Sequence, residues 1–481
     1  MFFRVGILDD CSITILCDGY ALSVRFFSKN KKIFLKEAFM RRETIPFLRE
    51  NGRRETLYMI GIGGSGMYGL ARLALDLGYT VLGEDARESE NVGRLRSFGI
   101  HVTVGTGSLP LGVDAVVYSL AIDAEHPQRK EAQRRKIAVY TRTQMLEKLM
   151  KGYLVRIAVA GSHGKSSTVG MCAHILDVAG LSPTVLVGAD LSKKEGGYRK
   201  GAGNILLTEA CEYRDAFLSF SPTHAVVLNA DWEHADYFPS RESVLSSFDR
   251  FLNGQSVVLR LAGADTGLSA DHTLGSARGF HIRELTVDKG CPHFSVFYGE
   301  ALLSKISLRV MGAHQAQNAL AAFVLTYLLG VPIPSIRSAL ASYPGVGGRM
   351  EYQKDFYGSP LYLDYAHHPA ELLAAIRSAK SVRKRVACVF EPHTYSRVSA
   401  FEEELLSALS LADSVGILPI YAAREKNVYG VSSRALAKKC GGAYLPSFAS
   451  AAAFLRENAG EECALLLAGA GLIREVLPLT E

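Results

Sequence analysis

Residues 156–168 read Arg-Ile-Ala-Val-Ala-Gly-Ser-His-Gly-Lys-Ser-Ser-Thr, which is the most informative stretch of the chain. Its apolar beginning predicts a buried strand that breaks at Gly161, and the residues from Gly164 onward have the pattern of a helix. A strand, a glycine-rich turn and a helix that opens on Lys165 and Ser166 together form an arrangement that holds nucleotide phosphates. The backbone N–H groups face the phosphates, the lysine supplies a point charge, and the serine hydroxyl can ligate Mg²⁺. The spacing of the glycines is shorter than in the standard Walker motif, and the alternative interpretation is an ordinary strand-to-helix turn with an exposed lysine.

A second glycine-rich turn lies earlier in the chain. Residues 57–60 predict a strand, residues 61–66 read Gly-Ile-Gly-Gly-Ser-Gly, and residues 67–77 have a helical pattern. This matches the G-x-G-x-x-G turn that places a nucleotide diphosphate at a helix N-terminus. The next predicted strand, residues 80–83, leads into an acidic pair that includes Asp85, near the position that contacts a ribose hydroxyl. Alone, this signature indicates a diphosphate-containing nucleotide, most often NAD, or else a tight strand–helix packing turn.

The size and composition of the chain limit its class. At 481 residues it exceeds what one hydrophobic core usually supports, so we expect two to four domains. Hydrophobic residues at 48% are ordinary for a globular protein, and a net charge of +6 without a basic stripe argues against nucleic-acid binding. No apolar run reaches membrane-spanning length, and charged residues near the N-terminus argue against a secretory signal. The eight cysteines form no C-x-x-C pair, which suggests neither a zinc nor a thioredoxin motif and fits a reducing cytoplasm.

Strands and helices alternate along most of the chain, which predicts an α/β fold. Near the N-terminus, two strand-like runs flank Asp18-Gly19 and predict a hairpin with a two-residue turn. A Pro/Gly-rich break at residues 343–348 is the clearest linker. The expected divisions are an N-terminal extension with the hairpin and a charged linker (1–54), followed by three α/β units over residues 55–150, 151–343 and 344–481.

Polar side chains follow four further apolar strands, at the strand ends where α/β sheets place their sites. The four segments are 209–213 (Glu-Ala-Cys-Glu-Tyr), 229–236 (Asn-Ala-Asp-Trp-Glu-His-Ala-Asp), 364–369 (Asp-Tyr-Ala-His-His-Pro) and 391–397 (Glu-Pro-His-Thr-Tyr-Ser-Arg). Taken singly, each is also compatible with a capped loop, and a lone histidine at a strand end is more often structural than catalytic. Four such segments after a phosphate loop favour a binding or catalytic site.

In this order, the two turns and the four segments resemble the Mur ligases, together with residues 314–318. The resemblance extends over roughly residues 57–473 and is highly specific as a set. It implies three domains: an N-terminal Rossmann-like domain that binds a UDP-sugar, a central P-loop ATPase domain with a mostly parallel sheet, and a C-terminal Rossmann-like domain that binds an amino acid. In this family the first turn holds the pyrophosphate of the UDP-sugar. An NAD dehydrogenase would leave the second phosphate loop without a use.

The resemblance implies roles for single residues. Lys165, Glu209 and His234 are the expected catalytic residues, and Ser166, Glu209 and His234 are the expected Mg²⁺ ligands. The expected ATP-binding residues are Gly161, Ser162, His163, Gly164, Lys165, Ser166, Ser167, His314, Asn318, Arg349 and Asp364. The expected UDP-sugar-binding residues are Gly61, Gly63, Gly64, Ser65, Gly66, Asp85 and Ser119. The expected amino-acid-binding residues are Tyr365, His367 and Arg397.

Several positions depart from the family pattern. Serines in the phosphate loop stand where threonines are common and keep the hydroxyl groups. Gly348 takes the place of the first arginine of a frequent pair and leaves Arg349 alone, and Leu472 stands where an acid is usual. The run 232–235, Trp-Glu-His-Ala, also has unusual neighbours around its histidine. These differences bear on ligand contacts rather than on the activity itself.

The resemblance therefore implies an ATP-dependent ligase of peptidoglycan precursor synthesis that uses ATP and Mg²⁺. Segments 391–397 and 421–425 are similar to those of the members that add L-alanine to the carboxylate of UDP-N-acetylmuramate through an acyl phosphate. Two alternatives are a recycling ligase that joins a tripeptide to the same UDP-sugar and a catalytically weak nucleotide-binding regulator. We expect a cytoplasmic monomer or homodimer, without a membrane span and without a nucleic-acid partner.

Overall fold

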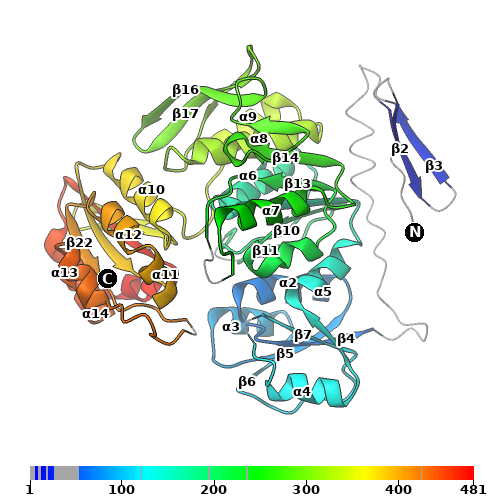
Figure 1. Ribbon diagram of the computed structural model, residues 1–481, viewed down its shortest axis with the longest axis horizontal. Helices are drawn as coiled ribbons and strands as arrows, with labels where there is room; N and C mark the ends of the chain where they lie inside the picture. Colours follow the sequence, from blue (N-terminus) through cyan, green and yellow to red (C-terminus); the bar gives the residue numbers. More distant parts are fainter. Residues whose placement is uncertain are drawn as a thin grey trace.

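The computed structural model describes residues 6–8, 12–17, 20–25, 54–120, 122–192, 195–233, 237–423 and 425–480. Three α/β units follow one another along the chain, each built on its own sheet (Figure 1). The predicted α/β fold class is confirmed. Within the described ranges, no helix combines the length and the apolar character needed to cross a bilayer.

A small antiparallel sheet precedes these units. β2 (Ser12–Cys17) pairs with β3 (Tyr20–Arg25), and β1 (Gly6–Leu8) pairs with β2. Cys17 lies opposite Tyr20, which is the register that a two-residue hairpin turn requires. The charged linker expected after the hairpin falls on residues 26–53, outside the described part of the chain.

The first α/β unit contains a five-stranded parallel sheet in the order β6-β5-β4-β7-β8. Its strands are β4 (Thr56–Ile60), β5 (Thr80–Asp85), β6 (His101–Val104), β7 (Ala115–Tyr118) and β8 (Ala138–Thr141). Its helices are α2 (Ser65–Asp76), α3 (Glu90–Ser97), α4 (Pro127–Arg134) and α5 (Arg142–Met150). The strand order reverses at β4, so the turn after β4 opens at the switch point where such sheets bind ligands.

The second unit contains a ten-stranded sheet in the order β11-β10-β12-β9-β13-β14-β15-β16-β17-β18. It is parallel from β10 to β16 and antiparallel at both edges, so the predicted mostly parallel sheet is confirmed. Its strands are β9 (Val155–Ala160), β10 (Thr184–Leu186), β11 (Tyr198–Arg199), β12 (Ile205–Glu209), β13 (His224–Val227), β14 (Leu259–Gly263), β15 (His272–Leu274), β16 (Phe280–Asp288), β17 (Cys291–Tyr298) and β18 (Ala301–Ser307). Its α-helices are α6 (Lys165–Val178), α7 (Arg241–Leu252), α8 (Gln315–Leu328) and α9 (Ile333–Ser342).

The third unit contains a six-stranded sheet in the order β19-β20-β24-β21-β22-β23, in which only β19 is antiparallel. Its strands are β19 (Glu351–Phe356), β20 (Ser359–Asp364), β21 (Arg385–Glu391), β22 (Ser414–Ile417), β23 (Ala443–Tyr444) and β24 (Cys463–Gly469). Its helices are α10 (Pro369–Lys380), α11 (Tyr395–Ala400), α12 (Glu402–Leu409), α13 (Ser433–Lys439), α14 (Phe448–Asn458) and the 3₁₀ segment η3 (Ile473–Thr480).

The apolar cores of the three units are not equally separate. One buried cluster runs through the first two units and contains Met67 and Leu149 as well as Phe217 and Phe248. The buried clusters of the third unit contain only residues from Met350 onward. The first two units are therefore packed as one body, and the third unit stands beside them (Figure 1).

The partly buried His224 side chain should make the stability of the protein depend on pH. Burial, and then the nearby Arg156 guanidinium, lower the pKa of His224 from 6.5 to about 4. The folded protein binds this proton less readily than the unfolded chain does, so the stability that His224 contributes is complete above about pH 6.5 and is lost as the pH falls toward 4. We expect His224→Gln to flatten the fall in melting temperature between about pH 7 and pH 4.5.

The melting temperature of His224→Gln should be followed alongside that of His101→Gln, which changes an exposed histidine of β6. Equal pH slopes in these two variants and the wild type would contradict the assignment of a neutral buried imidazole.

Candidate active site between the second and third units

The phosphate loop joins β9 to α6 through two glycines that permit close packing. Gly161 and Gly164 have φ of 139° and 84°, where a side chain is strained. A Cβ at Gly164 would lie 2.3 Å from the Asn318 side-chain oxygen. The first turn of α6 has no side-chain cap and no acidic residue, so its N–H groups are open to an anion.

Lys165 is held inside this loop by a buried carboxylate. Its Nζ lies 3.1 Å from Glu212 Oε2 and 3.1 Å from the Ser162 carbonyl oxygen, and it also donates to the Gly161 carbonyl oxygen. Burial disfavours the ammonium, but Glu212, together with the nearby Cys211 and Glu233, outweighs this effect and raises the pKa of Lys165. The sequence motif contained Glu212, yet sequence reasoning did not assign it to the site. Only the folded chain shows that it partners the lysine.

A second set of bonds ties the loop to the segment after β13. The His163 N–H donates to the Asn229 side-chain oxygen at 2.9 Å, and the Asn229 amide donates back to the His163 carbonyl at 3.1 Å. The Ser162 hydroxyl bonds both backbone groups of Asp231 at 2.9 Å. The Ser162 hydroxyl therefore holds the neighbouring loop.

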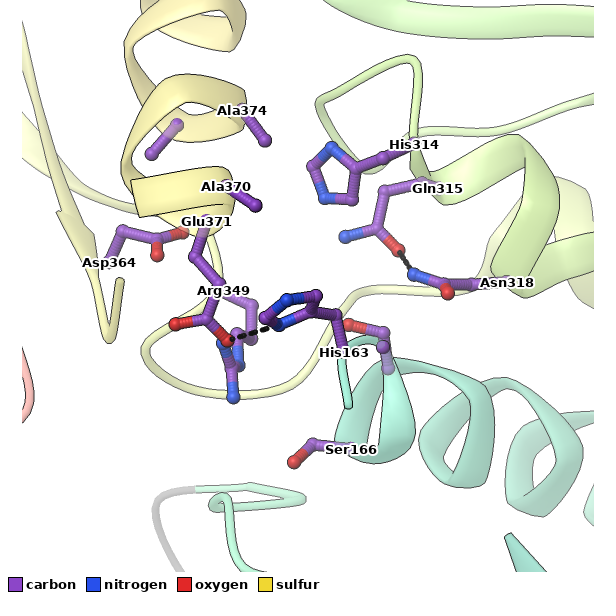
Figure 2. Close-up of a pocket in the computed structure, with 13 residues that line it drawn as sticks. His163, Ser166, His314, Gln315, Asn318, Arg349, Asp364, Ala370, Glu371 and Ala374 are labelled. Atoms are coloured by element: carbon purple, nitrogen blue, oxygen red, sulfur yellow. Dashed lines mark hydrogen bonds and ion pairs between the residues drawn. The ribbon is translucent and has the colours of Figure 1, made fainter. Parts of the chain in front are cut away.

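A cavity of about 230 Å³ opens between the phosphate loop, the start of α8 and the third unit (Figure 2). The expected ATP-binding residues that line it are His163, Gly164, Ser166, Ser167, His314, Asn318, Arg349 and Asp364. Gly161, Ser162 and Lys165 belong to the same loop. Sequence reasoning missed the lining residues Gln315, Ala370, Glu371, Ala374 and Ala375.

At the α8 side of the cavity, the orientation of one amide group and the protonation state of one histidine are already fixed in the protein itself. Asn318 Nδ2 donates to Gln315 Oε1 at 3.0 Å. Burial, and then Arg349, lower the pKa of His314 to about 4, so its ring is neutral at neutral pH. A neutral imidazole beside a side-chain amide is suited to an uncharged aromatic ring such as a nucleotide base.

Glu371 is the residue through which the third unit meets the phosphate loop. Its carboxylate lies 3.5 Å from His163 Nδ1, 3.6 Å from Arg349 Nη1 and 3.2 Å from His367 Nδ1 (Figure 2 shows the contact with His163). Burial opposes its charge, but His367, His163 and Arg349 hold the pKa of Glu371 well below its usual range. Its position three residues after His368, the N-cap of α10, is that of a capping-box acid, which is the signal that a sequence search could have used.

The turn before β19 is fixed by Asp364. Its two carboxylate oxygens accept the N–H groups of Met350 at 2.7 Å and Ala366 at 2.8 Å. Burial raises the pKa of Asp364 to about 6. Gly348 in this turn has φ of 68°, a conformation that strains a side chain, and the Arg474 guanidinium lies next to it. Asp364 therefore positions Arg349 as well as lining the cavity.

The three expected amino-acid-binding residues come together around a fourth. His367 Nδ1 lies 2.9 Å from the Tyr365 carbonyl oxygen, and Arg397 Nη1 donates to His393 Nδ1 at 3.0 Å. The rings of His367 and His393 are 5.6 Å apart. Burial is the main cause that lowers the pKa of His367 to about 3 and that of His393 to about 4. Sequence reasoning had quoted His393 within its motif without assigning it to the site.

The first glycine-rich turn lies at the carboxyl edge of the first sheet, away from this cavity. Asp85 Oδ2 accepts the Gly63 N–H at 2.8 Å, and a Cβ at Gly63 would lie 2.9 Å from that oxygen. Asp85 thus holds the turn in shape. α2 begins without a side-chain cap, and the Arg142 side chain, which sequence reasoning missed, lies over Gly66. The remaining expected UDP-sugar residues lie in this turn or follow β7: Gly61, Gly64, Ser65 and Ser119.

The expected metal ligands are only partly described. Glu209 ends β12, and its Oε1 is buried without a hydrogen-bond partner. Its charge acts on Arg349 across the domain boundary. Ser166 lines the cavity in the first turn of α6. His234 lies outside the described residues, so its expected role stays a prediction.

A phosphate loop that faces a third domain across a cavity, with a second nucleotide turn on a domain of its own, defines a multidomain ATP-dependent ligase. Family comparison agrees: the Mur ligase family catalytic domain matches residues 56–154, the Mur ligase middle domain residues 159–326, and the glutamate ligase domain of Mur ligases residues 348–471. The chain belongs to the Mur ligase family.

Curated relatives match along most of the chain. A UDP-N-acetylmuramate–L-alanine ligase of Caldanaerobacter subterraneus is 36% identical, over 87% of this chain and 96% of its own. A protein of the same name from Aquifex aeolicus is 35% identical, over 89% and 96%. Among solved structures, the UDP-N-acetylmuramate–alanine ligase of Thermotoga maritima has a TM-score of 0.77 at 24% identity, over 88% and 98%. A murein peptide ligase of Psychrobacter arcticus has a TM-score of 0.68 at 20% identity, over 89% and 98%. At these identities the two structures show the shared fold.

The geometry around Glu371 predicts the effect of neutralising it. Glu371→Gln keeps the shape but removes the charge that faces Arg349 and His163. We expect the KM for ATP to rise about tenfold, which corresponds to about 1.4 kcal/mol. Steady-state kinetics with varied ATP check this. Glu403→Gln, on the exposed face of α12, is the matched control, and an equally small effect of both changes would show that Glu371 does not act on the nucleotide.

Proposed function

We propose that this enzyme joins L-alanine to the carboxylate of UDP-N-acetylmuramate with hydrolysis of ATP, as a cytoplasmic step of peptidoglycan precursor synthesis. The observation that carries the proposal is the cavity in which the phosphate loop faces Arg349, Glu371 and the nearby group of Tyr365, His367 and Arg397. The names and the 33–36% identity of the curated relatives support the same reaction. The six described cysteines are free, in keeping with a reducing compartment.

The reaction needs activation because a carboxylate is a poor acyl donor. The substrate carboxylate attacks the γ-phosphorus of ATP, the bond to the bridging oxygen of ADP breaks, and an acyl phosphate forms. The alanine amine then attacks the acyl carbon, loses a proton, and inorganic phosphate leaves with the former carboxylate oxygen. The developing charge on the transferred group faces the N-terminus of α6 and Lys165, which would exchange Glu212 for phosphate oxygens.

The donor set of the loop fits Mg²⁺. Glu209 supplies a buried carboxylate oxygen that no hydrogen bond satisfies, and Ser166 supplies a hydroxyl on the first turn of α6. Hard oxygen ligands of this kind suit Mg²⁺. We propose that Glu209, Ser166 and His234 hold the metal, which would neutralise charge on the phosphates.

The proposed amino-acid subsite depends on the positive charge of the Arg397 guanidinium. Arg397 contacts His393, and no carboxylate of the described residues lies within ion-pair distance of its guanidinium. A guanidinium without a carboxylate can grip the free carboxylate of alanine with two parallel hydrogen bonds. The His367 and His393 rings are neutral, so they do not compete with the Arg397 guanidinium for the carboxylate.

The UDP-sugar would bind on the first unit. We propose that its pyrophosphate meets the uncapped N-terminus of α2 at residues 61–66, with Ser119 near the nucleoside and Asp85 holding the turn. Arg142 over Gly66 adds a cation at the same place. We also propose that the divisions near residues 150 and 343 separate the units that bind the three substrates.

Phosphate release from ATP tests the reaction. With UDP-N-acetylmuramate present, L-alanine should stimulate release more than glycine, L-serine or the tripeptide L-Ala-γ-D-Glu-meso-diaminopimelate. Lys165→Ala should lower turnover at least about a thousandfold, because it removes the charge that offsets the γ-phosphate, while binding of the UDP-sugar persists. Preference for the tripeptide would assign the recycling reaction instead, and turnover within about tenfold of wild type would remove Lys165 from the phosphate site.

Arg397 gives a separate test of the amino-acid subsite. Arg397→Ala should raise the KM for alanine at least about tenfold, with smaller changes in the KM for ATP and for the UDP-sugar. Arg397→Lys should restore little, because lysine supplies charge without the planar fork. Arg377→Ala, at an exposed position of α10, is the control. Equal small changes in all three KM values would place the alanine carboxylate elsewhere.

A further inference from the structure

Three ligand-type side chains from two domains meet beside the nucleotide cavity. His163 comes from the phosphate loop, Glu233 from the segment after β13, and His368 from the N-cap of α10. Glu233 Oε1 lies 3.9 Å from His163 Nδ1 and 3.9 Å from His368 Nε2. All three ligand atoms lie within 4.8 Å of one another. None of these contacts is short enough for a hydrogen bond, although Glu233 and His368 are each only 8% exposed.

The chemistry of this cluster points to a metal ion. Two imidazole rings and one carboxylate form the three-ligand set of many zinc sites, whose fourth position is left to water. Both ring nitrogens of His163 are buried without a short hydrogen bond, and Nδ1, which faces Glu371 at 3.5 Å, would exchange this ion pair for the metal. Ligation through His163 Nδ1 would leave Nε2–H directed toward Asp231 Oδ2, 3.7 Å away, in the carboxylate–histidine–metal arrangement that orients such rings.

Metal ligation by His368 would break one weak hydrogen bond of its ring. Its Nδ1 accepts a long hydrogen bond of 3.4 Å from the Ala370 N–H, so ligation through Nε2 would move the ring proton to Nδ1 and end that contact. Metal–ligand distances near 2.1 Å would also draw the three atoms together from their present spacing. Side-chain rotations can supply this movement, because the three residues lie on two loops and a helix N-cap.

We propose that His163, Glu233 and His368 form a site for a divalent transition metal of the zinc class, which clamps the third domain onto the phosphate loop. The site is distinct from the Mg²⁺ ligands proposed above. Imidazole ligands favour Zn²⁺ or Co²⁺ over Mg²⁺. The zinc-class ion therefore binds to the two histidines and Glu233, and Mg²⁺ binds at the other site. Because two ligands belong to the second unit and one to the third, the ion ties together domains whose apolar cores are separate.

The chain carries its own reporter for this clamp. Trp232, the single tryptophan of the sequence, precedes Glu233, and its ring centre lies 6.4 Å from that of Phe401 in the third unit. Phe401 in turn packs on the His368 ring at 4.9 Å. Tightening of the domain boundary by a metal should therefore change the tryptophan emission.

The experiment titrates the full-length protein with Co²⁺ and Zn²⁺ in excess Mg²⁺, without nucleotide, and records cobalt absorption, calorimetric stoichiometry and tryptophan emission. We expect one strong site per chain with the visible spectrum of low-coordinate cobalt. His368→Asn, which keeps a good helix cap, and Glu233→Gln, which keeps the shape, should each weaken binding about 100-fold or more and abolish the emission change. His101→Asn, an exposed histidine far from the cluster, should bind as the wild type does.

Equal affinity and emission change in the wild type and both cluster variants would overturn the proposal, as would displacement of Co²⁺ by millimolar Mg²⁺. Circular dichroism and melting temperature establish that each variant is folded, and either variant alone decides the question. The titration involves no UDP-sugar, amino acid or turnover, so its failure would leave the proposed ligation reaction untouched.

Discussion

A buried carboxylate without enough water around it needs cations and hydrogen-bond donors as neighbours, and the Glu371 side chain has such neighbours on both sides of a domain boundary. His163 belongs to the phosphate loop, whereas Arg349 and His367 belong to the third unit. Removing any one partner would leave charge uncompensated in a low-dielectric setting. The position of the third unit, and with it the cavity, depends on this cluster of contacts.

The separation of the apolar cores bears on how the third unit can move relative to the first two. The first two units share one apolar cluster, so the first glycine-rich turn and the phosphate loop are held in a fixed relation. The third unit has its own clusters and meets the phosphate loop through polar groups around the cavity. Polar contacts can be exchanged for ligand contacts at little cost, whereas apolar cores cannot. Closure of the third unit over bound substrates is the motion that this division favours.

Charge is distributed unevenly within the site. Lys165 and Glu371 keep their charges because strong partners face them, while burial keeps His314, His367 and His393 neutral. Cationic groups therefore remain where we propose that phosphate or carboxylate binds, and neutral rings line the places suited to a base or to the amino-acid backbone. Both the phosphate loop and the proposed amino-acid subsite follow this principle.

Local patterns in the sequence determined the α/β fold, the two glycine-rich turns and the motif residues that line the cavity. Parallel strands buried on both faces must be apolar, and a loop that packs as tightly as Gly164 against Asn318 must contain glycine, so both features are written into short stretches. Only the tertiary structure shows that Glu212 partners Lys165, that Glu371 joins two domains, and that the His393 ring lies beside the His367 ring. These pairings join residues distant in sequence or in separate domains, and the long-range packing of elements selects among many equally polar candidates.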